Sequence, residues 1–97
     1  MDTFLRILYL EDRPEDAEIV LRLLKNSGFR FESLLAMDQK EFLEALDSYT
    51  PDIILSDNSL PDFNASEALR IIQQRCIDAP FILVTGAVSE EFAAKII

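Results

Sequence analysis

The sequence predicts an α/β fold in which a parallel sheet is doubly wound, with helices on both of its faces. Short apolar segments alternate along the chain with segments whose apolar residues recur at helical spacing, and this alternation is typical of a helix-covered parallel sheet. The length of 97 residues and the hydrophobic content of 49% fit one domain, and no Gly, Ser or Pro-rich linker divides the chain.

The first strand and helix are expected at residues 5–10 and 14–27. The earlier segment is short and almost wholly apolar, which favours a buried strand. The later one has Pro14 in its first turn and an apolar stripe at helical spacing, and Gly28 after it is a typical helix stop.

The second strand is expected at residues 29–37, where charged and polar residues interrupt the apolar ones, as an edge strand allows. Asp38 then begins a helix, because Glu41 follows at the spacing of a capping box. This helix should end before Pro51, since the residue preceding a proline is disfavoured in the α region.

The third strand is expected at residues 53–57, and Asn64 or Ser66 can cap the helix that follows its loop. A fourth buried strand is expected at residues 81–84. Ser-Glu-Glu then has the composition of the first turn of a fourth helix, over residues 89–97.

Composition excludes several kinds of site. Eighteen acidic and nine basic residues give a formal charge of −9, which argues against direct binding of nucleic acid. No apolar run approaches a membrane span, so we expect a cytoplasmic protein with no membrane partner. The chain has no His and one Cys, which excludes disulfides and Cys/His zinc sites, and we expect Cys76 to be a packing residue within the third helix.

Polar side chains follow three of the expected strands. Glu11 and Asp12 come after the first strand, Asp57 ends the third, and Thr85 follows the fourth. In a doubly wound sheet of order 2-1-3-4 the first and third strands are neighbours, and ligands bind beyond the carboxyl ends of the strands. We therefore expect the three carboxylates to line one crevice.

Three crowded carboxylates repel one another unless a cation lies between them, and oxygen ligands favour Mg²⁺ or Ca²⁺. Mg²⁺ suits the site better because it leaves room for a phosphoryl oxygen, and the backbone carbonyl of Ser59 is a further candidate ligand. Asp57 is then a candidate phosphoryl acceptor, with the Thr85 hydroxyl beside the phosphoryl group. The alternative is that Asp57 only opens a turn and that Glu11 and Asp12 only favour the start of a helix.

The motifs Glu11-Asp12, Asp57, Leu60-Pro61-Asp62 and Thr85-Gly86-Ala87 together resemble the receiver domain of two-component response regulators. The resemblance covers the chain from Arg6 and implies the flavodoxin-like sheet order 2-1-3-4-5. Residues 1–97 would then be one receiver domain that ends in its fourth helix, without the fifth βα unit.

The resemblance implies phosphorelay signalling rather than enzymatic turnover. Asp57 would accept a phosphoryl group from a histidine kinase or phosphotransfer protein, with Mg²⁺ held by Glu11 and Asp12, and Thr85 would move to contact the phosphate. That movement would change the face of the fourth helix, which would bind an output domain or a second copy. The loop residues of the same site would be Asn58, Ser59 and Pro61, and the chain has no counterpart of the lysine that the family carries on its fifth strand.

Two other functions fit the same sequence. An aspartyl-phosphate phosphatase would usually carry a second acid two residues after the nucleophile, where this chain has Ser59. An unphosphorylated interaction module would keep the receiver fold and bind partners through the face of the fourth helix, but the acid pair argues against it.

Overall fold

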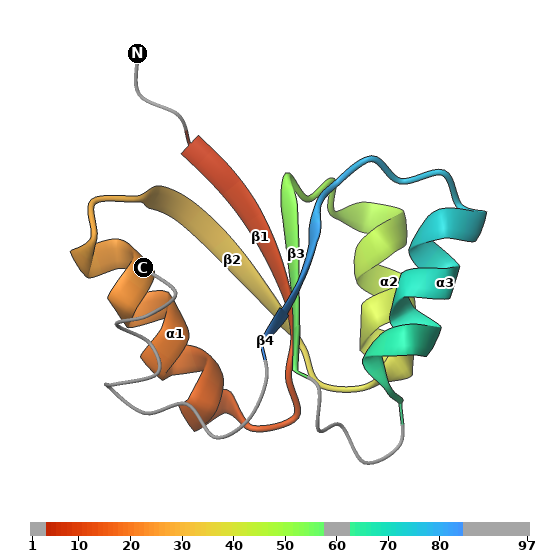
Figure 1. Cartoon of the computed structure of the whole chain (residues 1–97), viewed down its shortest axis with the longest axis horizontal. Helices are drawn as coiled ribbons and strands as arrows, with labels where there is room; N and C mark the ends of the chain where they lie inside the picture. Colours follow the sequence, from red (N-terminus) through yellow and green to blue (C-terminus); the bar gives the residue numbers. More distant parts are fainter. Residues whose placement is uncertain (1–3, 58–62, 85–97) are drawn as a thin grey trace.

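The computed structural model describes residues 4–57 and 63–84, whose strands form a parallel sheet of order β2-β1-β3-β4. Helix α1 lies on one face of this sheet, and α2 and α3 lie on the other (Figure 1). The strands are β1 (Phe4–Leu10), β2 (Arg30–Ala36), β3 (Ile53–Asp57) and β4 (Phe81–Val84), and the helices are α1 (Pro14–Asn26), α2 (Gln39–Ser48) and α3 (Ala65–Gln74). The predicted fold class and strand order are confirmed.

The register of the strands brings their carboxyl ends to one edge of the sheet. Leu10, the last residue of β1, pairs with Ala36 of β2 and Ser56 of β3, and Asp57 pairs with Val84 of β4. Glu11 extends the β1–β2 pairing, because its N–H donates to the carbonyl of Ala36 at 2.9 Å. The residues that follow β1 and those that end β3 therefore lie side by side.

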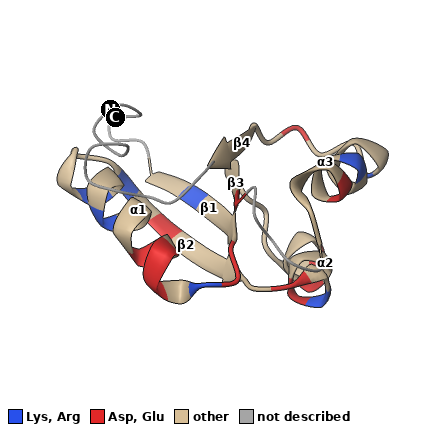
Figure 2. Cartoon of the chain, turned by 60° about the horizontal axis from the view of Figure 1, so that its bottom comes forward, with Lys and Arg blue, Asp and Glu red and all other residues tan. Residues whose placement is uncertain are grey.

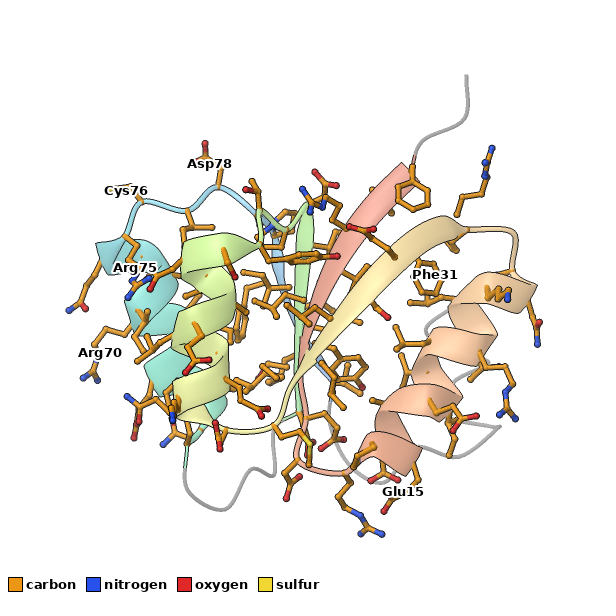
Figure 3. The ribbon with its side chains drawn as sticks, turned by 180° about the vertical axis from the view of Figure 1, so that it is seen from behind. Glu15, Phe31, Arg70, Arg75, Cys76 and Asp78 are labelled. Carbon is orange, nitrogen blue, oxygen red and sulfur yellow. The ribbon has the colours of Figure 1, made fainter. Side chains whose placement is uncertain are left out.

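Each face of the sheet has its own apolar core, because successive side chains along a strand point to opposite faces. On the α2 and α3 face, the rings of Phe42 and Phe63 pack with centroids 5.7 Å apart, among Leu8, Leu10, Ala36, Ala45, Ile54, Ala68 and Ile72. The α1 face buries a second set, formed by Ile7, Tyr9, Ala17, Val20, Leu55 and Val84. Phe31 of β2 lies between its strand and α1 (Figure 3).

Side chains cap two of the helices as their sequences predict. The Asp38 carboxylate accepts from the Glu41 N–H at 2.9 Å, and Glu41 accepts in turn from the N–H of Met37 at 2.7 Å. The Asn64 side chain accepts from the Glu67 N–H at 2.9 Å. Asn64 is therefore the cap of α3.

The prediction that Cys76 packs within the third helix is wrong. Helix α3 ends at Gln74, and Cys76 is exposed with a φ of 56°, just beyond the carboxyl end of α3 (Figure 3). Its N–H donates to the carbonyl of Gln73 at 3.2 Å, and the N–H of Ile77 donates to Ile72 at 3.1 Å. This is a Schellman ending, in which Cys76 takes the left-handed position that glycine usually occupies.

Strand β4 is less buried than its sequence predicts. Only Val84 is buried, whereas Ile82 and Leu83 are 46% and 44% exposed, because β4 pairs only with β3 within the described residues. The fourth helix expected at residues 89–97 lies outside the described residues. Among residues 4–57 and 63–84, no helix is long and apolar enough to cross a membrane.

Candidate metal centre at the carboxyl edge of the sheet

The structure brings Glu11, Asp12 and Asp57 together at the carboxyl edge of the sheet. One carboxylate oxygen from each of the three lies within 4.8 Å of the others. Strand β1 leads directly into Glu11 and Asp12, and Asp57 is the last residue of the neighbouring strand β3. Figure 2 shows the acidic residues, in red, along the segment that joins β1 to α1.

The three carboxylates differ in burial. Glu11 is 3% exposed, whereas Asp12 and Asp57 are half-buried. The N–H of Arg13 donates to the Glu11 carboxylate at the long distance of 3.3 Å. Helix α1 begins at the next residue with Pro14, which has no N–H to donate and suits the first helical position.

Crowding and burial make the ionised form of Glu11 unfavourable. Burial raises the pKa of Glu11 to about 8, with further contributions from hydrogen bonding to Asp12 and Asp57 and from the Asp57 charge, against a smaller lowering by the Arg13 N–H. Glu11 therefore retains its proton near neutral pH. A cation at this point would replace that proton and remove the repulsion.

The positive side chain nearest in sequence is turned to other partners. The guanidinium of Arg13 lies 3.3 Å from the Glu15 carboxylate and 3.6 Å from that of Asp16, and its side chain is exposed. Within the described ranges, no Lys or Arg forms an ion pair with Glu11 or Asp12. The site thus has the charge and the ligand type that a hard divalent cation requires.

Several residues that the sequence suggests for this site lie outside the described residues. They are Asn58, Ser59, Pro61 and Thr85. The expected backbone ligand and the expected phosphate contact therefore stay predictions.

The structure adds one polar group that the sequence did not single out. The hydroxyl of Tyr9 is buried and has no hydrogen-bond partner. In the sequence, Tyr9 is one member of an apolar strand segment, and such a segment does not indicate which face each residue occupies. The structure reveals it as a polar atom within the apolar core on the α1 face of the sheet.

Comparison with known proteins identifies relatives over most of the chain. A family model described as response regulator receiver domain matches residues 7–97. The DNA-binding response regulator MtrA of Mycolicibacterium smegmatis is 30% identical over 89% of this chain and 37% of its own. The cell cycle transcriptional regulator CtrA of Caulobacter vibrioides is 28% identical over 95% of this chain and 38% of its own, so the chain spans little more than a third of either relative.

Solved structures agree with the sequence relatives. The bacteriophytochrome response regulator AtBRR has a TM-score of 0.73 with this chain at 27% identity, covering 97% of this chain and 74% of its own. The receiver domain of Francisella response regulator 1452 has a TM-score of 0.71 at 23% identity, over 90% of this chain and 70% of its own. At that identity the second likeness supports the fold alone.

Proposed function

Because this chain belongs to the response regulator receiver domain family, we propose that it is a phosphoacceptor of two-component signalling and that Asp57 is the residue phosphorylated. The observation that carries the proposal is the meeting of Glu11, Asp12 and Asp57 within 4.8 Å at the carboxyl edge of a parallel sheet. Asp57 ends a central strand, so its carboxylate is held by the sheet while a donor approaches from the edge.

The proposed reaction moves a phosphoryl group from nitrogen to oxygen. A carboxylate oxygen of Asp57 attacks the phosphorus of a phosphohistidine, the P–N bond breaks, and the bond's electron pair stays with the imidazole of the donor. Glu11, Asp12 and Asp57 would hold Mg²⁺, which when bound supplies positive charge that offsets the charge on the phosphoryl oxygens. Asp57 attacks as the carboxylate, the nucleophilic form of its side chain.

The remaining roles follow from the family resemblance. Ser59 would contribute its backbone carbonyl to the metal, Thr85 would contact the phosphoryl group, and Asn58 and Pro61 would shape the loop between them. Phosphorylation would then alter the face of the expected fourth helix, where an output domain or a second copy would bind. Two relatives are named as a DNA-binding regulator and a transcriptional regulator, so a regulatory output in the cytoplasm is proposed rather than further enzymatic activity.

The test is incubation of the 97-residue chain with Mg²⁺ and a small phosphodonor such as acetyl phosphate, followed by intact mass and peptide mapping. We expect at most a weak gain of one phosphate in the wild type, confined to Asp57, and none in Asp57→Asn. Asp78→Asn is the matched control, because Asp78 is exposed and lies in the loop before β4, away from the acidic edge (Figure 3). Equal phosphate gain by Asp57→Asn would contradict the proposal, and a wild type that neither binds Mg²⁺ nor gains phosphate would favour the unphosphorylated interaction module.

A further inference from the structure

We propose that Tyr9 is a positioning residue of the acidic site, whose buried hydroxyl donates a hydrogen bond toward the Glu11 carboxylate, directly or through one water, once Mg²⁺ is bound. The inference rests on the proposed function, because it assigns the hydroxyl a role in holding the metal ligand. It concerns a residue two positions before Glu11 on the same strand.

The ring of Tyr9 is enclosed by apolar groups. Tyr9 is fully buried on the α1 face of the sheet. In register it pairs with Leu35 of β2 and Leu55 of β3, while Ala17 and Val20 of α1 belong to the same core. None of these side chains can accept a hydrogen bond. They enclose the ring in apolar groups but leave its hydroxyl without an acceptor.

The unpartnered hydroxyl requires an explanation. Among residues 4–57 and 63–84, only Tyr9 and Tyr49 have a buried side-chain oxygen or nitrogen without a hydrogen-bond partner. Such an atom destabilises the folded state by about 1–3 kcal/mol, and phenylalanine would fill the same space without that cost. A buried hydroxyl that is left without a partner indicates that its hydrogen bond forms only when a ligand binds.

The charges that act on the hydroxyl lie at the carboxyl edge of the sheet. The pKa of Tyr9 is raised, first by burial and then by the negative charges of Glu11, Asp57 and Asp16. A phenol hydroxyl can donate a hydrogen bond, and the carboxylates of these residues can accept one. Tyr9 and Glu11 are two residues apart on β1 and its extension, so their side chains leave the same face of the sheet.

Glu11 is the acceptor that most needs this donor. Its carboxylate is 3% exposed, and the neutral donor that reaches it is the Arg13 N–H at 3.3 Å. Asp16 is more exposed and already lies 3.6 Å from the Arg13 guanidinium. As a ligand to Mg²⁺, Glu11 would be a charged carboxylate, and ligating carboxylates are normally held by hydrogen bonds from an outer shell.

The chain offers a matched pair of variants. It contains two tyrosines and no tryptophan, so Tyr9 is the sole tyrosine in Tyr49→Phe, and Tyr49 is the sole tyrosine in Tyr9→Phe. Tyr49 follows α2 and stacks under Arg6 at the amino end of β1, far along the strand from Glu11. Each variant removes one buried hydroxyl and leaves its ring in place.

The experiment titrates Mg²⁺ into the 97-residue wild type and both variants, following affinity by calorimetry and the phenol by fluorescence and near-ultraviolet absorption. We expect Tyr9→Phe to bind Mg²⁺ about tenfold more weakly, with an unfolding free energy without metal that is unchanged or higher. Tyr49→Phe should bind as the wild type does, and its single tyrosine should show a change in fluorescence and a red-shifted absorption as Mg²⁺ binds. The tyrosine of Tyr9→Phe should not respond.

Three results would overturn the role of Tyr9. They are equal Mg²⁺ affinity in Tyr9→Phe and the wild type, a loss of affinity that accompanies an equal loss of metal-free stability, and a Tyr9 signal that ignores Mg²⁺. Each of them leaves the proposed phosphoacceptor function standing, since the wild type still binds the metal. Absence of Mg²⁺ binding by the wild type would instead overturn the metal centre itself, and the role of Tyr9 with it.

Discussion

The amino and carboxyl ends of the sheet both combine a buried tyrosine hydroxyl with acidic side chains, yet they treat charge in opposite ways. At the amino end, the Arg6 guanidinium lies 2.9 Å from the Glu32 carboxylate and 4.6 Å from the centroid of the Tyr49 ring. The Asp52 carboxylate also accepts a hydrogen bond from the backbone N–H of Arg6 at 2.9 Å. At the carboxyl end, three carboxylates meet within 4.8 Å.

The difference indicates that the amino end contributes to stability and that the carboxyl end suits a ligand. The Arg6–Glu32 pair is nearly half exposed, so it contributes modestly, as surface ion pairs do. The acidic edge is more buried, and this burial raises the pKa of Glu11 to about 8. Without a cation, desolvation and repulsion of these carboxylates therefore oppose folding. Such a cost is expected where the folded chain is prepared for a ligand of opposite charge.

The largest expected effect comes from breaking the acidic edge with Glu11→Gln. Loss of an outer-shell partner typically lowers metal affinity 10–100-fold, so loss of a direct ligand should lower Mg²⁺ affinity by about tenfold or more. The matched control is Glu32→Gln at the amino end, which should bind Mg²⁺ as the wild type does. Calorimetry on the three proteins gives the comparison, and equal affinities for Glu11→Gln and the wild type would remove Glu11 from the site.

A second effect concerns pH and the metal-free protein. Burial and nearby carboxylates raise the pKa of Glu11 to about 8 from its ordinary value of 4.5. Between these two pH values the folded state keeps the Glu11 proton, whereas the unfolded state has released it. The contribution of Glu11 to stability is therefore greatest below 4.5 and decreases as the pH rises toward 8.

Urea unfolding at pH 5.5 and pH 8 measures this effect as a difference between proteins. The wild type should lose stability over this interval relative to Glu11→Gln, on the order of 1 kcal/mol for each pKa unit, and saturating Mg²⁺ should restore the wild type at pH 8. Parallel pH dependences for the two proteins without metal would show that the pKa of Glu11 is not raised.

The smallest expected effect comes from the amino end. Arg6→Met keeps the backbone hydrogen bonds with Asp52 but removes the ion pair with Glu32 and the cation over Tyr49. We expect a loss of about 0.5–1 kcal/mol in unfolding free energy, smaller at high salt, with Mg²⁺ affinity unchanged. Arg6→Lys, which keeps the charge, should lose less, and a change in Mg²⁺ affinity for either variant would show that the two ends are coupled.

Much of the fold was predictable because local signals agree with the global arrangement. Alternating apolar and helical segments indicated the strands and helices, and the position of Asp57 after a buried strand indicated the edge where the carboxylates meet. The ending of α3 was not predictable, because Cys76 carries the left-handed turn and no glycine marks it. The almost wholly apolar first strand likewise does not show that Tyr9 faces α1.

The pairing of β1 with β3 has a consequence for how the folded state can be observed. Glu11 and Asp57 come from strands separated in sequence by a complete helix–strand–helix segment, so their carboxylates could share a cation only while those two strands are paired. A ligand that binds only the folded chain stabilises it in proportion to the logarithm of its concentration over its dissociation constant. Mg²⁺ occupancy would therefore report on the opening of the sheet centre, and hydrogen exchange at the β1 amides should slow as the metal concentration rises.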